Sequence, residues 1–135
     1  MNYFHSFSSD LFSTNLKDYN IDSCLIPDFL YKVSFIPIGV TCAMRVCKLF
    51  ESDLELMENE IEIDRLTNHP NLMKMLFHFL GPDQTWRCIF PYSQYDSLGE
   101  LCKPYGLDEP VIVFVLADIL KAVDYLHRNN IIHRF

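Results

Sequence analysis

The sequence predicts an α+β fold in which antiparallel β-hairpins are followed by helices. Short segments rich in aromatic and β-branched residues come in two pairs, and a turn containing glycine and proline separates the members of each pair. A stripe of apolar residues at helical spacing then runs toward the end of the chain. The resulting order is strands, helix, strands and helix, without an internal repeat.

Composition limits the classes of function. The chain has 135 residues, of which 50% are hydrophobic and 14% aromatic, so a globular protein is favoured over a disordered one. Its net charge of −7, with no cluster of Lys and Arg, opposes nucleic-acid or anionic-membrane partners. Five cysteines without CxxC spacing favour reduced thiols in a cytoplasmic, or additionally nuclear, protein. His69 and His78 form no ligand set with a nearby cysteine, so no metal site is expected.

The N-terminal residues 1–24 are expected to form a loosely ordered lead-in, because they show no clear period. They lack a basic region followed by a continuous apolar region, which predicts that there is no signal peptide. The most apolar run, residues 111–117, is interrupted by Asp118 and is too short to span a bilayer.

The first hairpin is predicted from "FLYKVSFI" and "VTCAMRVCKLF", which flank the turn residues "PIG". A helix should follow, with Ser52 as its N-cap and its end near Leu66. The segment "TNHPN" then ends that helix, since a residue before proline is pushed out of the helical region.

The second hairpin is predicted from "LMKMLFHFL" and "TWRCIFPY" around the turn "GPDQ". A short helix covers "SLGELCK", and Asp108 caps a long helix from Glu109 to Arg128. The apolar stripe of the long helix consists of Ile112, Val115, Leu116, Ile119, Leu120, Val123 and Leu126.

Four strings in this order resemble the N-terminal half of a eukaryotic protein kinase domain. They are "CAMRVCKL" at the Ala-x-Lys strand, "ENEIEIDRLTNHPN" at the following helix, "CIFPYSQYDSLGEL" at the hinge, and "ILKAVDYLHRNNIIHRF" before the catalytic loop. The resemblance implies a truncated protein kinase-like fold over residues 25–135. It would comprise an antiparallel N-lobe with one helix at about 25–92, a hinge at about 91–96 and the start of the C-lobe at 97–135.

Strand alternation places Ala43, Arg45 and Cys47 on one face of the third strand of this resemblance. A small residue beside a long cation suits a surface that admits a flat adenine and meets phosphate oxygens. The family uses lysine at the position of Arg45, and arginine is not a conservative replacement at such a site. Lys48 is the alternative candidate, but alternation turns it to the opposite face. Arg45 as an ordinary solvated strand residue is the other interpretation.

Glu60 falls within the apolar arc of its helix and therefore needs a partner, for which Arg45 is the candidate. Asp53 and Asp64 also project near this arc. A solvated acidic helix is the alternative interpretation.

A glycine-rich loop is missing from the position that the resemblance implies. The glycines are residues 39, 81, 99 and 106, so none precedes the first hairpin turn. Kinases bring backbone N–H groups of such a loop close to the phosphates. Pro27 and Asp28 would instead place a negative charge there, so phosphate cradling is expected to be lost.

The resemblance places Phe90 at the gatekeeper position, followed by the hinge residues Tyr92 and Ser93. With Ala43 and Arg45, these are the candidate nucleotide-binding residues. The proline after Phe90 lacks an N–H group but keeps its carbonyl, so ATP binding without a Mg²⁺ requirement stays open. The alternative is that both aromatic residues are plain core residues.

Phe135 stands where catalytic kinases carry an aspartate that accepts the substrate's proton, and phenylalanine has no proton acceptor. The preceding His133 and Arg134 are expected to brace the loop. Arg45, Glu60 and Phe135 are thus degenerate catalytic positions, and no active catalytic residue is expected.

These departures resemble a pseudokinase, with most similarity to the sterile-20-related adaptor group. That resemblance implies a catalytically inactive adaptor that binds and allosterically activates a partner serine/threonine kinase and also binds a helical-repeat scaffold. The alternative is a fragment of a divergent sterile-20-type serine/threonine kinase that transfers phosphate from ATP to protein. A truncated product without an independent function is the third interpretation.

Overall fold

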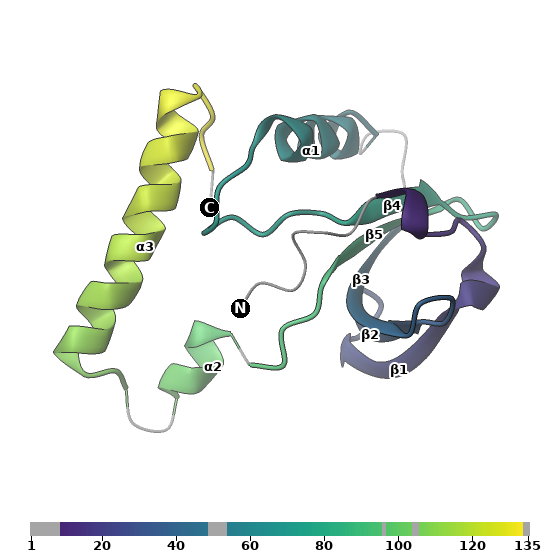
Figure 1. The fold of residues 1–135 in the computed structure, drawn as a ribbon, viewed down its shortest axis with the longest axis horizontal. Coiled ribbons are helices and arrows are strands. Elements are labelled where there is room, and N and C mark those ends of the chain that lie inside the picture. The colour runs from purple at the N-terminus through teal and green to yellow at the C-terminus, as the bar shows by residue number, and fades with distance from the viewer. Residues whose placement is uncertain (1–8, 49–53, 96, 104–105, 134–135) are drawn as a thin grey trace. The chain divides into compact units, whose positions relative to one another are not determined.

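The computed structural model describes residues 9–48, 54–95, 97–103 and 106–133, and its elements divide between two compact units (Figure 1). Unit 1 comprises the residues up to Glu60 together with Lys74–Tyr92, and unit 2 comprises Ile61–Met73 and the residues from Ser93 onward. The division after Tyr92 falls within residues 91–96, where the hinge is predicted.

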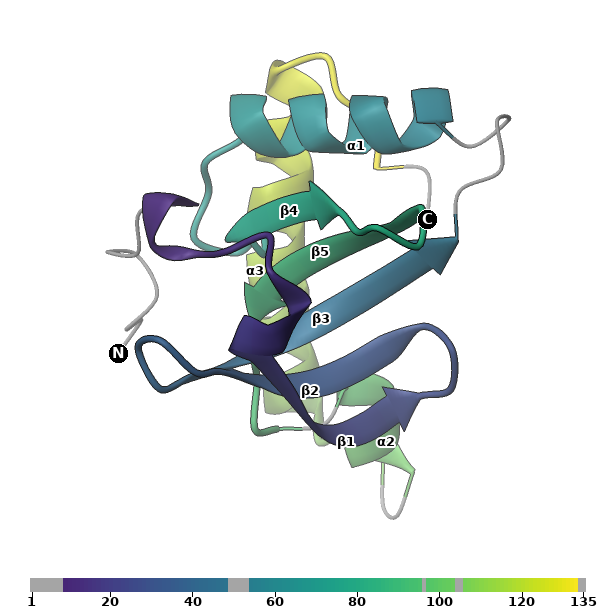
Figure 2. The ribbon, with the colours of Figure 1, turned by 90° about the vertical axis from the view of Figure 1, so that its right-hand side faces the viewer.

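Unit 1 contains a five-stranded antiparallel sheet in the order β1-β2-β3-β5-β4 (Figure 2). Both predicted hairpins are confirmed, since β2 pairs with β3 and β4 pairs with β5. The strands are β1 (Tyr19–Ile26), β2 (Leu30–Phe35), β3 (Val40–Lys48), β4 (Phe77–Leu80) and β5 (Thr85–Pro91).

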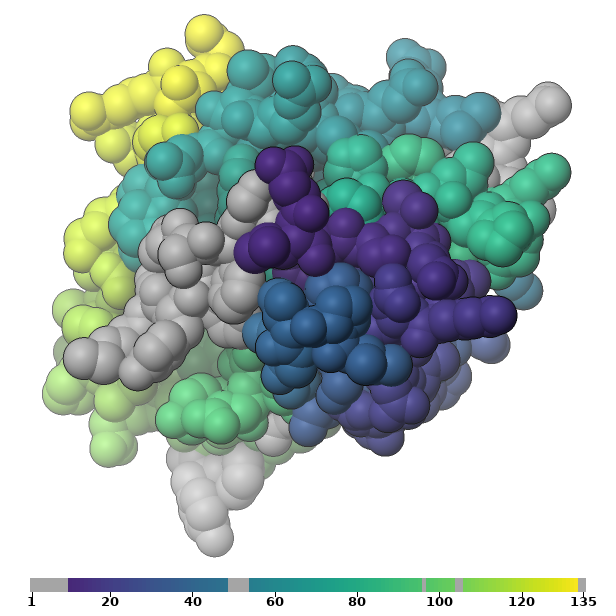
Figure 3. Space-filling model, turned by 45° about the vertical axis from the view of Figure 1, so that its right-hand side comes forward, coloured from purple at the N-terminus to yellow at the C-terminus, as the bar shows by residue number. Residues whose placement is uncertain are grey.

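The expectation of a loose lead-in is wrong for residues 9–24. Two 3-10 helices, η1 (Ser9–Leu11) and η2 (Leu16–Asp18), lead directly into β1, which pairs with β2. Phe12 and Tyr19 are buried, and their rings lie 5.1 Å and 4.9 Å from the ring of Phe35. Large aromatic rings stabilise a core by the area that they bury. Figure 3 shows the purple residues of this segment beside the blue residues that join β2 to β3.

The core of unit 1 lies on one face of the sheet. Val33, Phe35, Cys42 and Ile89 are fully buried there, and Met44 is nearly so. The alternation predicted for β3 is therefore confirmed on its core face, and Ala43 and Arg45 point to the other face.

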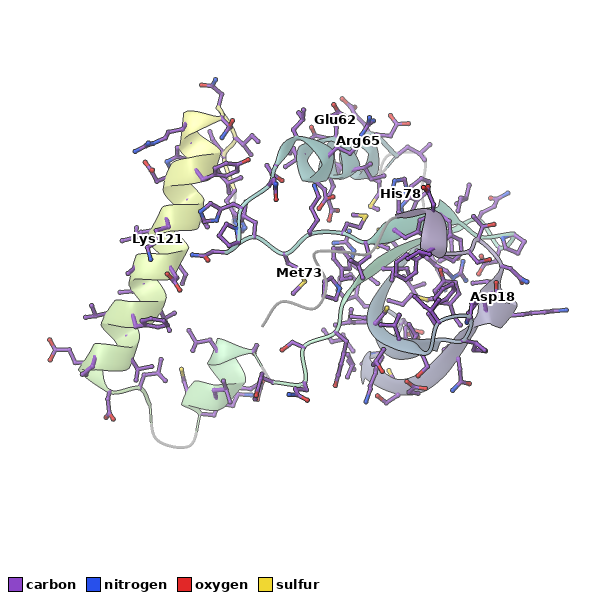
Figure 4. The ribbon with its side chains drawn as sticks, in the orientation of Figure 1. Asp18, Glu62, Arg65, Met73, His78 and Lys121 are labelled. Carbon is purple, nitrogen blue, oxygen red and sulfur yellow. The ribbon has the colours of Figure 1, made fainter. Side chains whose placement is uncertain are left out.

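The predicted first helix is confirmed as α1 (Leu54–Leu66), and Ser52 lies outside the described residues. Residues 54–60 of α1 belong to unit 1, and residues 61–66 belong to unit 2. Glu62 and Arg65 lie on the polar side of α1 and form an exposed ion pair of 3.6 Å (Figure 4).

Unit 2 contains the other two predicted helices, α2 (Leu98–Cys102) and α3 (Glu109–Arg128). Ser97 caps α2, because its Oγ accepts a hydrogen bond from the backbone N–H of Glu100 at 3.3 Å. Asp108 is the N-cap residue of α3, as predicted, but its side chain makes no capping hydrogen bond. Lys121 projects from the middle of α3 in Figure 4 and pairs with Asp118.

The "HPN" turn of unit 2 is bound to α3. The hydroxyl of Tyr125 accepts a hydrogen bond from the Asn68 N–H at 2.9 Å, and the His69 ring lies 5.1 Å from the Tyr125 ring. The Asn71 amide donates to the carbonyl of Asp118 at 2.8 Å. Three contacts therefore join this turn to two positions of one helix that lie about two helical turns apart.

Within the described ranges, no helix combines the length and the apolar character that crossing a membrane would need.

Candidate functional site

The candidate site in unit 1 is centred on an ion pair between β3 and α1. Nη2 of Arg45 donates a hydrogen bond to Oε1 of Glu60 at 2.6 Å. The two side chains are 20% and 42% exposed, so the pair is only partly screened by water. The sequence prediction that these two residues meet is confirmed, whereas their role toward a nucleotide stays a prediction.

Two further groups of β5 surround the Arg45 guanidinium. Its Nη2 lies 3.7 Å from the sulfur of Cys88, and its Cζ lies 5.4 Å from the centroid of the Phe90 ring. Nε of Arg45 is buried and has no hydrogen-bond partner among the described residues. The guanidinium is thus held in one place by Glu60, a thiol and an aromatic face.

The protonation states of the site follow from burial and charge. Burial acts to lower the pKa of Arg45, but the hydrogen bond and charge of Glu60 outweigh it, and the pKa is raised overall. Burial raises the pKa of the Cys88 thiol to about 11, although the nearby guanidinium opposes that shift. Near neutral pH the site therefore holds a permanent cation and a protonated thiol.

Ala43 lies between two long cationic side chains on the same face. The register of the sheet places Lys32 of β2 and Phe90 of β5 directly opposite Ala43, one on each side. The ammonium of Lys32 lies 4.9 Å from the centroid of the Tyr92 ring. Both distances from cation to ring lie within the range of cation–π contacts. The candidate residues Ala43, Arg45, Phe90 and Tyr92 are thus brought together.

Lys32 and Cys88 also belong to this group, although the sequence did not single them out. Neither stands at a position that the family's short motifs mark. The signal that could have found them is cross-strand register, because the turn of residues 36–39 sets which β2 residue faces Ala43.

The β1–β2 turn occupies the place of the missing glycine-rich loop. Pro27, Asp28 and Phe29 are exposed, and Asp28 has a positive φ of 56°. The Phe29 N–H closes this turn by donating a hydrogen bond to the Ile26 carbonyl at 3.1 Å. Glycine adopts this conformation without cost, but the chain uses a residue with a carboxylate.

The remaining predicted positions lie elsewhere. Ser93 belongs to unit 2, where its Oγ accepts a hydrogen bond from the Tyr95 N–H at 3.2 Å. Phe135 lies outside the described residues. The five cysteines are all free, and no three His, Cys, Asp or Glu side chains in the described ranges are grouped as metal ligands would be.

An antiparallel five-stranded sheet, a helix joined to its third strand by an ion pair, and further helices after a hinge define a kinase-like class of fold. The protein kinase domain family matches residues 39–134, and the chain belongs to that family. The predicted resemblance is thereby confirmed.

Individual relatives fall into two groups. The chain is 32% identical over 111 residues to serine/threonine-protein kinase fray1 of Dictyostelium discoideum, covering 78% of this chain and 19% of the relative. It is 29% identical over 126 residues to serine/threonine-protein kinase pak-2 of Caenorhabditis elegans, covering 93% and 23%. It is 30% identical over 81 residues to STE20-related kinase adapter protein alpha of Homo sapiens, covering 58% and 19%. The chain thus spans about a fifth of the length of these relatives.

Proposed function

We propose that this chain is part of a catalytically inactive kinase-like adaptor that binds and allosterically activates a partner serine/threonine kinase. The observation that carries the proposal is Arg45 at the position where the family uses lysine. Its guanidinium is bound to Glu60 at 2.6 Å and lies over Phe90. A kinase lysine meets phosphate oxygens as a compact point charge, whereas this planar group is larger and already occupied.

The β1–β2 turn supports the same conclusion. A phosphate cradle requires backbone N–H groups that approach the ligand closely, which glycines allow. Here the exposed turn carries the Asp28 carboxylate, which repels phosphate. Phe135 adds a third argument from the sequence, because it cannot accept the proton of a substrate hydroxyl.

The adaptor part of the proposal draws on the similarity to a protein named STE20-related kinase adapter protein alpha. The proposal also includes a helical-repeat scaffold as a second partner and a cytoplasmic location, with a nuclear location as the alternative. Activation would operate by differential binding, since a partner that binds one state of a kinase more tightly shifts its population toward that state.

A phosphotransfer assay on the full-length gene product tests the loss of catalysis. We expect no Mg²⁺-dependent transfer above background from the wild type or from an Arg45→Lys variant. The same preparation should raise the activity of a co-purifying serine/threonine kinase several-fold. Robust Mg²⁺-dependent transfer that an Arg45→Ala substitution abolishes would contradict the proposal.

The second candidate function is phosphate transfer by a divergent sterile-20-type kinase. It is favoured by the similarity to fray1 and pak-2, both of which are named as kinases. The same assay separates the two candidate functions. An enzyme transfers phosphate without a partner, whereas an adaptor only raises the phosphate transfer that its partner kinase carries out.

A further inference from the structure

The face of the sheet around Ala43 is the part of unit 1 that a purine would contact in a nucleotide-binding relative. That use needs an open apolar surface on which a flat ring can lie. In this chain two long cations lie next to Ala43, Lys32 opposite it on β2 and Arg45 two residues along β3.

Each cation is directed to one aromatic ring. Arg45 lies over Phe90 at 5.4 Å, and Lys32 lies over Tyr92 at 4.9 Å. Lys32 is half-buried, so its methylene groups and not only its ammonium cover the surface. A purine placed against Ala43 would have to displace Lys32 from Tyr92, while Arg45 is held by Glu60 as well.

An adenine nucleotide does not fit the described residues at its phosphate end either. The turn that would approach the phosphates contains no glycine and exposes the carboxylate of Asp28. The surface for the ring and the cradle for the phosphates are therefore both unsuited, for independent reasons.

We infer that Lys32 is an internal occupant of the purine surface and that it excludes adenine compounds from this domain. The inference deepens the proposed adaptor function, on which it rests for its biological meaning. It assigns Lys32 a specificity-determining role. The adaptor would then take its active shape without a nucleotide, through protein contacts alone.

Binding measurements on the full-length protein test this inference, with adenosine and ATP as separate probes and with Mg²⁺ absent and present. Adenosine reports on the purine surface alone, because it has no phosphates. The wild type should bind neither probe at millimolar concentration by calorimetry. A Lys32→Val variant replaces the long cation by a residue that suits a strand, and should bind adenosine at least tenfold more tightly than the wild type.

Lys48→Val is the matched control. It removes the same charge from a strand of the same sheet, but Lys48 is exposed at the end of β3 and alternation turns it to the other face. This control should leave adenosine binding unchanged. An additional Asp28→Gly substitution in the Lys32→Val background should strengthen ATP binding but not adenosine binding. Thermal melts of every variant show whether the fold is retained.

Two results would overturn the inference. One is wild-type binding of adenosine or ATP with an affinity that Lys32→Val leaves unchanged. The other is a folded Lys32→Val protein that still binds no adenosine. Neither result bears on partner activation, because that is measured as the activity of the partner kinase and not as nucleotide binding to this protein. An adaptor that binds ATP would therefore refute only the inference about Lys32, and an inactive protein that excludes ATP would refute only the adaptor proposal.

Discussion

At the scale of single residues, the Arg45–Glu60 pair shows how a family position can keep its structural role after its side chain has changed. Strand alternation and the helical wheel each direct one partner toward the other. Arginine adds a stacking surface that lysine lacks, and Phe90 uses it. The pair therefore joins α1 to the sheet whether or not the domain binds a nucleotide.

The first prediction concerns the strength of this contact. Glu60→Gln should lower the free energy of unfolding by about 1 kcal/mol, between the small effect of an exposed pair and the larger effect of a buried one. Urea unfolding can be followed by the fluorescence of Trp86, which is the single tryptophan and lies on β5. Glu58→Gln, on the exposed side of α1, is the control and should have almost no effect. Equal effects of the two substitutions would show that the contact does not stabilise the fold.

The second prediction concerns buried thiols. Burial raises the pKa of Cys42 and of Cys88 to about 11, whereas a thiol in an unfolded chain has a pKa of about 8.5. Between these values the unfolded chain loses protons that the native state keeps, so stability falls as pH rises. The free energy of unfolding should fall by up to about 1.4 kcal/mol per pH unit for each thiol above about pH 9.

Urea melts at about pH 7, 8.5 and 10 measure this slope. Cys88→Ala should make the slope shallower, whereas Cys24→Ala, at an exposed position, should not. A free energy of unfolding that is constant over this range would contradict the assigned burial.

At the scale of elements, local signals predicted the two hairpins and all three α-helices. Turn residues and a period of two or 3.6 act over a few neighbouring positions, so they can be recognised in one sequence. The second hairpin is shorter than its sequence predicts, because β4 begins at Phe77 and not at Leu72. The first backbone hydrogen bond from this segment to β5 is donated by Leu76 to the carbonyl of Ile89.

Strand β1 was missed for a physical reason. Apolar and polar residues alternate only over Tyr19–Asp22, and all but the first residue of the strand are exposed, so the signal is too short to mark it. Its register with β2 also shifts twice, between Ile21 and Ser23 and between Cys24 and Ile26, which breaks any simple period. The Lys32–Tyr92 contact was missed because it depends on register between distant segments, which composition does not reveal.

The third prediction concerns the β4–β5 hairpin. A methyl group at Gly81 would collide with Nη1 of Arg87, which donates to Asp83 at 2.9 Å and to the carbonyl of Thr85 at 3.0 Å. Gly81→Ala should displace the guanidinium and lower the free energy of unfolding by about 1–2 kcal/mol. Gly99→Ala is the control, because only the Ser97 hydroxyl lies near and alanine favours the helix α2. A Gly81→Ala protein as stable as the wild type would contradict the tight hairpin.

At the scale of the whole molecule, α3 carries many exposed apolar side chains. Seven large apolar side chains of this helix are between 40% and 70% exposed. They are Val111, Ile112, Val113, Phe114, Leu116, Ile119 and Leu120. An apolar surface of this kind promotes association in water.

The fourth prediction is that the 135-residue polypeptide self-associates in solution. Size-exclusion chromatography with light scattering should show species larger than a monomer. Phe114→Glu combined with Leu120→Glu should give a monomer, since both residues lie on the exposed face of α3. The control is Gln84→Glu combined with Gln94→Glu, which adds the same charge at exposed positions outside α3 and should leave the protein associated. A monodisperse wild-type monomer would contradict the prediction.

The position of Phe12 in the core has a consequence for synthesis on the ribosome. Its ring packs on Phe35 and stacks 6.0 Å from the ring of Phe77, and the same core includes Ile89. Phe12 therefore leaves the ribosome long before several of its partners, and the closing of this core must wait for β5. Until then the early aromatic residues stay accessible to chaperones, and a translational pause before Ile89 would prolong that interval.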